Sequence, residues 1–216
     1  MIDYILCTPD HPHFERVKVL PNYIDLVEIK KDFSLLNERT VLDLTLLPPN
    51  QKEELLSDIN KKSSALIYSD LGAYYIPKYK KICPALKLCF NLNTYSPKNK
   101  FELLYSELDD HKKEFTSWAQ ETLSLESFEI KVLNDVFPLS QTLAMIINEA
   151  YFSLEDGLCT KEDIDTAMKY GVNYPLGPFE WADKGSLKSI VYLLDDLFEA
   201  KKDKRYACSE LLRQDI

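Results

Sequence analysis

The spacing of apolar residues changes character partway along the chain. In the first part, short apolar runs of strand length alternate with stretches of helical periodicity, which is the order expected of a layered α/β domain. The predicted strands are Ile2–Cys7, Tyr23–Ile29, Thr40–Leu47, Ala65–Ser69, Leu86–Leu92 and Phe128–Val132, and the predicted helices between them are Asn50–Lys62 and Leu108–Leu123. This order predicts a mostly parallel sheet flanked by helices.

The second part of the chain is helical throughout. Apolar residues recur at helical spacing over Pro138–Asp156, and Gly157 stands where a glycine would end that helix. Another apolar stripe runs from Leu187 to about Ala200. Because no strand pattern interrupts this region, we predict two domains, residues 1–137 and an all-α unit over residues 138–216.

Composition places the chain among ordinary globular proteins. Its 216 residues are 45% hydrophobic and 28% charged, enough to bury a sizeable core. Asp and Glu total 35 against 26 Lys and Arg, for a net charge of −9. This balance argues against nucleic acid or an anionic membrane as a partner.

Targeting and redox signals are equally plain. No apolar run approaches the roughly 18 residues that span a bilayer, and no basic stretch precedes the first apolar residues. The five cysteines are odd in number and form no CxxC pair, so neither a disulfide framework nor a zinc site is expected. We therefore expect a cytoplasmic protein with no membrane segment.

The glycines bear on nucleotide binding. Of five in the chain, only Gly72 precedes residue 150. A GxGxxG or GxxxxGK loop needs glycines because the backbone must approach a phosphate closely. The segment after the first predicted strand reads Thr8-Pro-Asp-His-Pro-His13 instead. A standard dinucleotide loop is therefore absent.

Three segments carry a family resemblance. Ile147–Gly157, Glu162–Gly171 and Asn173–Asp183, in this order and spacing, resemble the C-terminal domain of 3-hydroxyacyl-CoA dehydrogenases, and Leu211-Leu212-Arg213 is similar to the family's close. The resemblance implies a Rossmann-like N-terminal domain for NAD, here shortened. It also implies a helical C-terminal domain that forms a homodimer and helps to bind an acyl-CoA thioester.

The resemblance further implies a reaction and its residues. Hydride leaves C3 of the substrate while a histidine, oriented by a glutamate, takes the hydroxyl proton. Glu102 matches that glutamate, whereas Cys89 falls at the histidine and Ser140 at an asparagine that holds a substrate oxygen. The family's serine turn falls on Asp70–Ala73, which has no hydroxyl. Because a thiol is a poor substitute for imidazole near neutral pH, we predict a degenerate site without a cofactor.

The remaining candidate residues have simpler explanations. His11 and His13, with Asp10, could ligate a metal, but we expect a solvated loop and no metal site. His111 lies among charged residues and is expected on the surface. Without a resemblance, Cys89 would be a small core residue and Glu102 an exposed carboxylate at a strand end.

Three functions remain open. The first is a degenerate relative of the family, catalytically impaired, that keeps dimerisation and possible acyl-CoA binding. The second is a working NAD-dependent 3-hydroxyacyl-CoA dehydrogenase of fatty acid metabolism with a non-standard site. The third is a purely structural dimer. Lost site residues favour the first, so whether the chain is an enzyme is undecided by sequence.

Overall fold

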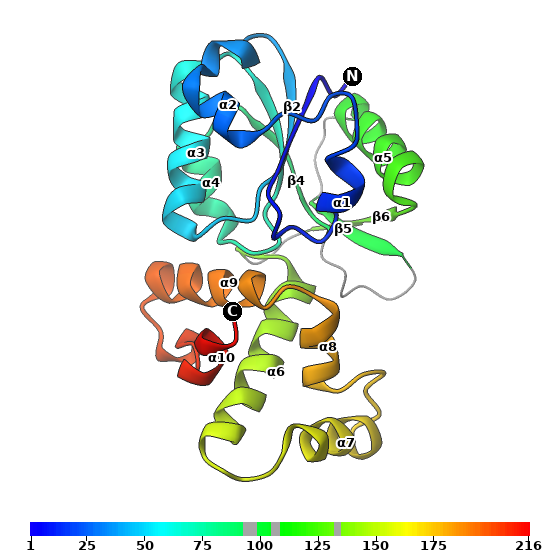
Figure 1. The fold of residues 1–216 in the computed structure, drawn as a ribbon, viewed down its shortest axis with the longest axis vertical. Coiled ribbons are helices and arrows are strands. Elements are labelled where there is room, and N and C mark those ends of the chain that lie inside the picture. The colour runs from blue at the N-terminus through cyan, green and yellow to red at the C-terminus, as the bar shows by residue number, and fades with distance from the viewer. Residues whose placement is uncertain (93–98, 105–108, 132–134) are drawn as a thin grey trace.

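The computed structural model describes residues 1–92, 99–104, 109–131 and 135–216. It has a lobe built on a six-stranded sheet (the sheet lobe, residues 1–131) and a lobe of helices alone (the helical lobe, residues 138–216) (Figure 1). The strands are β1 (Tyr4–Cys7), β2 (Thr40–Leu44), β3 (Leu66–Asp70), β4 (Leu86–Asn91), β5 (Lys100–Leu104) and β6 (Glu126–Ile130).

The helices of the sheet lobe are α1 (Phe14–Val17), α2 (Leu26–Lys31), α3 (Pro49–Lys62), α4 (Ile76–Ile82) and α5 (Asp109–Leu123), with a 3-10 turn at Phe33–Leu36. The helical lobe contains α6 (Pro138–Glu155), α7 (Lys161–Gly171), α8 (Pro178–Lys184), α9 (Leu187–Lys201) and α10 (Glu210–Gln214), with a 3-10 turn at Lys204–Tyr206. The sequence-based prediction of a shortened α/β Rossmann-like lobe followed by an all-α lobe is confirmed.

The strands lie in the sheet in the same order as in the chain, β1 to β6. β1 to β4 are parallel neighbours, β5 is antiparallel to β4, and β6 is parallel to β5. A standard doubly wound sheet has the order 3-2-1-4-5-6, in which the winding reverses at the first strand. Here β1 is the outermost described strand, paired on its free side only through a bridge between Ile5 and Tyr23. The described sheet therefore has no reversal point.

Alternate residues of the strands face two apolar cores. On one face, strand residues such as Val41 and Ile67 pack with α2, α3 and α4. On the other, Leu42 and Phe90 pack with α1 and α5 (Figure 1). Strands covered on both faces read as continuous apolar runs, which is why the sequence pattern located β1 to β4.

Helix starts in the helical lobe depend on carboxylates from neighbouring segments. Thr160 and Asp163 form a capping box at the start of α7. Asp165 accepts hydrogen bonds from the Phe179 and Glu180 amides and so caps α8. A Cβ on Gly177 would lie 2.2 Å from the Asp165 carboxylate, so this close approach requires glycine. These contacts position the α7–α8 pair beside α6.

The structure corrects several predictions of elements. The predicted strand Tyr23–Ile29 is wrong, because Asp25 accepts the Val27 amide at 2.7 Å and starts helix α2 instead. Strand β5 was not predicted from the sequence. Leu108 and Val132, predicted ends of a helix and a strand, lie outside the described residues. Among the described residues, no helix has the length and apolar character to cross a bilayer.

Candidate functional site at the junction of the two lobes

A buried polar cluster lies where β4 and β5 meet the start of α6. The Asn91 amide donates to the Glu102 carboxylate at 2.7 Å and to the Ser140 hydroxyl at 2.9 Å. The other carboxylate oxygen of Glu102 accepts the Leu139 backbone N–H at 3.1 Å. The structure thus brings together Glu102 and Ser140, two of the residues predicted from the sequence, through Asn91, which the sequence reasoning missed.

Burial defines the electrostatics of this Asn91–Glu102–Ser140 cluster. The three side chains belong to residues that are 2%, 3% and 5% exposed. Burial raises the pKa of the Glu102 carboxyl above its usual range, although the hydrogen bonds from Asn91 and Leu139 oppose the rise. The expectation of an exposed carboxylate at position 102 is therefore wrong.

Glu102 also completes the start of α6. The N-cap residue Phe137 has no side-chain acceptor, and Pro138 occupies the first turn. The Leu139 N–H is one of the amides that a helix start leaves without an intrahelical partner. The Glu102 carboxylate satisfies it and carries negative charge to the positive end of the helix.

Cys89 lies two residues before Asn91, so both side chains project from the same face of β4. The thiol is 2% exposed within the apolar core, and burial raises its pKa to about 12. Among the described residues, Cys89 makes no hydrogen bond to Glu102 or Ser140. The partner of the glutamate is Asn91, a difference of two positions that preserves the face of the strand and that strand pairing alone reveals.

The cluster has limited acid–base chemistry. An amide is not a base near neutral pH, and both N–H groups of Asn91 are engaged by Glu102 and Ser140. A Cβ on Gly72 would lie 2.2 Å from the side-chain oxygen (Oδ1) of Asn91, so the backbone at Gly72 packs tightly against the Asn91 amide. The Asn91 amide can form hydrogen bonds but cannot take a hydroxyl proton.

A second polar cluster closes the carboxyl ends of β1 and β3. His11 Nε2 lies 3.3 Å from the Asp70 carboxylate, and His13 Nε2 lies 3.1 Å from the Leu92 carbonyl oxygen. Asp70 also accepts the Gly72 and Leu92 amides, and these hydrogen bonds, with that of His11, hold its pKa below the usual range despite burial. Burial and the neighbouring His11 lower the pKa of His13 to about 4.

This burial overturns the prediction of a solvated histidine loop. His11 is 6% and His13 9% exposed, because the loop folds back onto Asp70. Pro9 and Asp10 are the exposed residues of the loop, and Asp10 pairs with Lys188 of α9 at 2.7 Å. Among the described residues, no group of three or more His, Cys, Asp or Glu could hold a metal ion. His111 is half-buried and lies 2.5 Å from the Tyr68 hydroxyl, so the prediction of a plain surface residue is also wrong.

Beneath this loop lies a fully buried ion pair. Lys52 of α3 reaches Asp43 of β2 at 2.6 Å, and both side chains are 0% exposed. The ammonium also donates to the Thr45 carbonyl oxygen at 2.9 Å, and Ser69 donates to Asp43 at 2.6 Å. Side chains of the protein itself therefore satisfy the polar groups at the end of β2.

These features do not fit a dinucleotide. In open α/β sheets, ligands bind outside the carboxyl ends of the strands at the point where strand order reverses, on a glycine-rich turn. The described sheet has no such reversal, and the turn after β1 has no glycine. The cavity at the strand ends, lined by His11, Asp70, Tyr74 and Ser189 among others, measures about 10 Å³. That volume holds at most about one water molecule.

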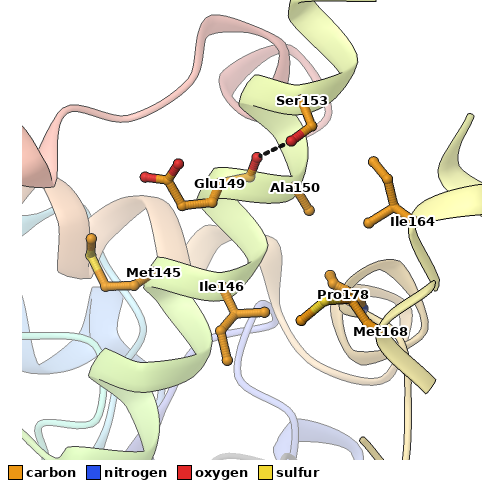
Figure 2. A pocket seen from close by; sticks show the side chains of 8 residues that line it. All are labelled: Met145, Ile146, Glu149, Ala150, Ser153, Ile164, Met168 and Pro178. Carbon is orange, nitrogen blue, oxygen red and sulfur yellow. Dashed lines mark hydrogen bonds between the residues drawn. The ribbon is translucent and has the colours of Figure 1, made fainter. Parts of the chain in front are cut away.

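An apolar groove lies on another part of the helical lobe. Ile146 and Ala150 of α6 lie on the side toward Ile164 and Met168 of α7 (Figure 2), and these residues line a cavity of about 330 Å³ that Met145 also lines. At 100° per residue, Met145 and Ile146 lie on the side of α6 away from Ser140. The groove is therefore separate from the Asn91–Glu102–Ser140 cluster.

Comparison with known proteins identifies the helical lobe. Residues 137–215 match the family model described as 3-hydroxyacyl-CoA dehydrogenase, C-terminal domain. The 3-hydroxyadipyl-CoA dehydrogenase of Escherichia coli is 46% identical over 74 residues, which are 34% of this chain and 16% of that protein. The 3-hydroxybutyryl-CoA dehydrogenase of Clostridioides difficile is 36% identical over 76 residues, or 35% of this chain and 27% of that one.

A solved structure extends the likeness to the whole fold. The (S)-3-hydroxybutyryl-CoA dehydrogenase of Ralstonia eutropha superposes with a TM-score of 0.63 at 19% identity, covering 99% of this chain and 93% of that one. At that identity the likeness shows the fold alone. The sequence matches thus span about a quarter or less of the curated relatives' length. The helical lobe therefore matches the C-terminal domain of 3-hydroxyacyl-CoA dehydrogenases, and the fold of the whole chain is that of a solved member of the family.

Proposed function

We propose that this chain is a member of the family that has lost dehydrogenase chemistry and binds an acyl-CoA thioester without oxidising it. One observation carries the proposal: the group hydrogen-bonded to Glu102 is the Asn91 amide, where the reaction implied by the family resemblance needs an imidazole. An amide cannot take the proton that leaves the substrate hydroxyl as hydride departs.

The strand ends support the same proposal. A dehydrogenase needs a hydride acceptor, and the described strand ends offer a cavity of about 10 Å³ filled by the protein's own polar groups. Turnover with NAD, the alternative function, would require both a new base and a new cofactor site. Acyl-CoA as the ligand class comes from relatives whose names specify acyl-CoA substrates and which share the helical lobe.

A thermal shift experiment separates the three functions. A ligand that binds only the folded protein, at about 100 times its Kd, adds about 2.7 kcal/mol, or about 5–10 °C in Tm for a chain of this size. We expect a shift with acetoacetyl-CoA and none with NADH. A shift with NADH would contradict the proposal and favour a working dehydrogenase, whereas no shift with either ligand would favour the purely structural dimer.

Binding should depend on the polar cluster. The matched pair of variants is Ser140→Ala, which removes a hydroxyl from the cluster, and Ser153→Ala, which removes one from the far end of α6. We expect the shift with acetoacetyl-CoA to shrink in Ser140→Ala and to persist in Ser153→Ala. Equal shifts in both variants would place the ligand elsewhere.

We also propose that the chain forms a homodimer through its C-terminal helices, in the cytoplasm. The apolar groove between α6 and α7 supports this, because buried apolar surface drives most protein association (Figure 2). Ile146→Glu should convert the dimer to a monomer in light-scattering chromatography. Leu158→Glu, at a 70% exposed residue outside the groove, is the control and should leave the mass unchanged.

A further inference from the structure

Helix α9 is attached to the sheet lobe by a buried carboxylate. Asp196, 1% exposed, accepts the Tyr75 backbone N–H at 2.8 Å and pairs with Lys78 at 2.9 Å. Tyr75 and Lys78 lie at the start of α4, after β3. They are 121 and 118 residues from Asp196 in sequence, so these contacts join the two lobes. Near the other end of α9, Lys188 pairs with Asp10. Helix α9 therefore lies along the sheet lobe at the carboxyl ends of the strands (Figure 1).

The start of α6 is held by polar contacts as well. Asn91 of β4 donates to Ser140, and Glu102 of β5 accepts the Leu139 N–H. Every one of these hydrogen bonds has one partner in each lobe. The members of the candidate site are thus also part of the joint between the lobes.

Most apolar packing lies within one lobe or the other, and Phe137, directly before α6, is fully buried in a cluster of the sheet lobe. The sheet lobe holds its own clusters, and the helical lobe holds another that contains α6, α8 and α9. Across the joint, Tyr192 packs partly against the sheet cluster and Tyr75 partly against the helical one. Lobes joined by a polar interface of this kind are expected to move relative to one another, unlike lobes that share a large apolar core.

We propose that Asp196 is the latch of this joint, and that the helical lobe must lift from the sheet lobe before a thioester can reach the Asn91–Glu102–Ser140 cluster. The three residues are at most 5% exposed with the latch closed, which leaves a ligand no contact with them. The gating role rests on the proposed function, because it assumes that the thioester binds at this cluster.

Lys78 has the contacts that a reversible latch requires. Its ammonium also lies 3.0 Å from Glu53 of α3, within the sheet lobe, and 3.7 Å from Glu199. When α9 moves away from the sheet lobe, Lys78 keeps the Glu53 carboxylate as a partner. Separation of the lobes therefore does not leave the Lys78 ammonium without a counter-charge. Asp196 gains water in exchange for Lys78, the Tyr75 N–H and the Tyr79 hydroxyl, which relieves the cost of its burial.

The test compares adjacent aspartates on α9. Asp196→Asn removes the charge that pairs with Lys78, while Asp195→Asn removes a partner of Arg213 within the helical lobe. The reporter is native-state hydrogen exchange of the Leu139 amide, which is bonded to Glu102 across the joint and not to Asp196. We expect exchange at Leu139 to be at least about tenfold faster in Asp196→Asn and unchanged in Asp195→Asn, with central strand amides unaffected in both.

Several outcomes would overturn the latch. Unchanged exchange at Leu139 in Asp196→Asn would do so, as would an equal rise at all amides, which signals global destabilisation. If Asp196→Asn does not fold, Lys78→Gln breaks the same pair from the other lobe and should give the same local effect. Acetoacetyl-CoA association, measured by stopped flow, should be faster in the latch variant. Faster exchange at Leu139 without binding of acetoacetyl-CoA would support the role of Asp196 in holding the joint and would contradict only the proposed function.

Discussion

The buried ion pair between Lys52 and Asp43 offers a quantitative test of how the strand ends are closed. Lys52→Met keeps the length of the side chain and removes its charge. Asp43 would then keep its hydrogen bonds from Ser69 and Thr45 but lose the cation 2.6 Å away, in a place where neither side chain has access to water. Breaking one partner of a buried pair costs about 3–5 kcal/mol. Since whole domains are stable by about 5–15 kcal/mol, this is a large fraction of the total.

Urea unfolding measures the loss. We expect the midpoint of Lys52→Met to fall with little change in slope, because the same surface is exposed on unfolding. Lys62→Met is the control: Lys62 lies on the same helix and pairs with Asp58 at 2.9 Å, but it is 53% exposed, so the cost should be about 0–1 kcal/mol. Adding Asp43→Asn to Lys52→Met should recover at least about 1 kcal/mol, because the uncompensated charge is removed.

The two results can refute the reasoning separately. The first result is the loss of unfolding free energy. If Lys52→Met loses no more than Lys62→Met, Asp43 does not remain as an uncompensated buried charge, and the ion pair does not stabilise the ends of the strands. If the double variant is less stable than Lys52→Met, the hydrogen bonds of Asp43, and not its charge, dominate the site.

Three further predictions follow from individual residues. Asn91→His should not create NADH oxidation with acetoacetyl-CoA, because a base without a cofactor site is insufficient; turnover above background would contradict this. His13 has its pKa lowered from 6.5 to about 4 in the folded state, so the unfolded chain binds the proton first. Stability from His13 is complete above about pH 6.5 and falls by about 3 kcal/mol as the pH drops to 4, a loss that His13→Asn should remove in urea unfolding at several pH values. Gly177→Ala should lower the free energy of unfolding by about 1–3 kcal/mol by displacing Asp165, whereas Gly171→Ala, with no atom within 4 Å of the new Cβ, should not destabilise.

Several features follow from local sequence and were predicted without the structure. Helices α6 and α9 have uninterrupted apolar stripes, and such periodicity determines a helix wherever it packs. β1 to β4 are mostly buried on both faces. Their apolar runs therefore predict strands whichever neighbour each strand pairs with. The absence of a glycine-rich loop is likewise a property of composition, and no folding can restore it. The domain boundary at residue 137 stays a prediction.

The partners of the site residues depend on tertiary structure. Which residue meets Glu102 is set by the pairing of β4 with β5, and a difference of two positions exchanges Cys89 for Asn91 while leaving the apolar pattern unchanged. Strand β5 carries a charged residue at a buried position, because Glu102 faces the start of α6 and not water. Local composition could not anticipate either contact.

The histidines show the same division. The loop Thr8–His13 is polar and proline-rich, which predicts exposure, yet Asp70 at the end of β3 and Leu92 after β4 supply the hydrogen bonds that bury both rings. Those partners are 59 and 79 residues away in sequence. Strands β1 to β4, helices α6 and α9 and the missing phosphate loop could be predicted from the sequence, because each is a local property. Strand order, the Asn91–Glu102 pair and the sealed strand ends were decided by the tertiary structure, because each depends on contacts between segments far apart in the chain.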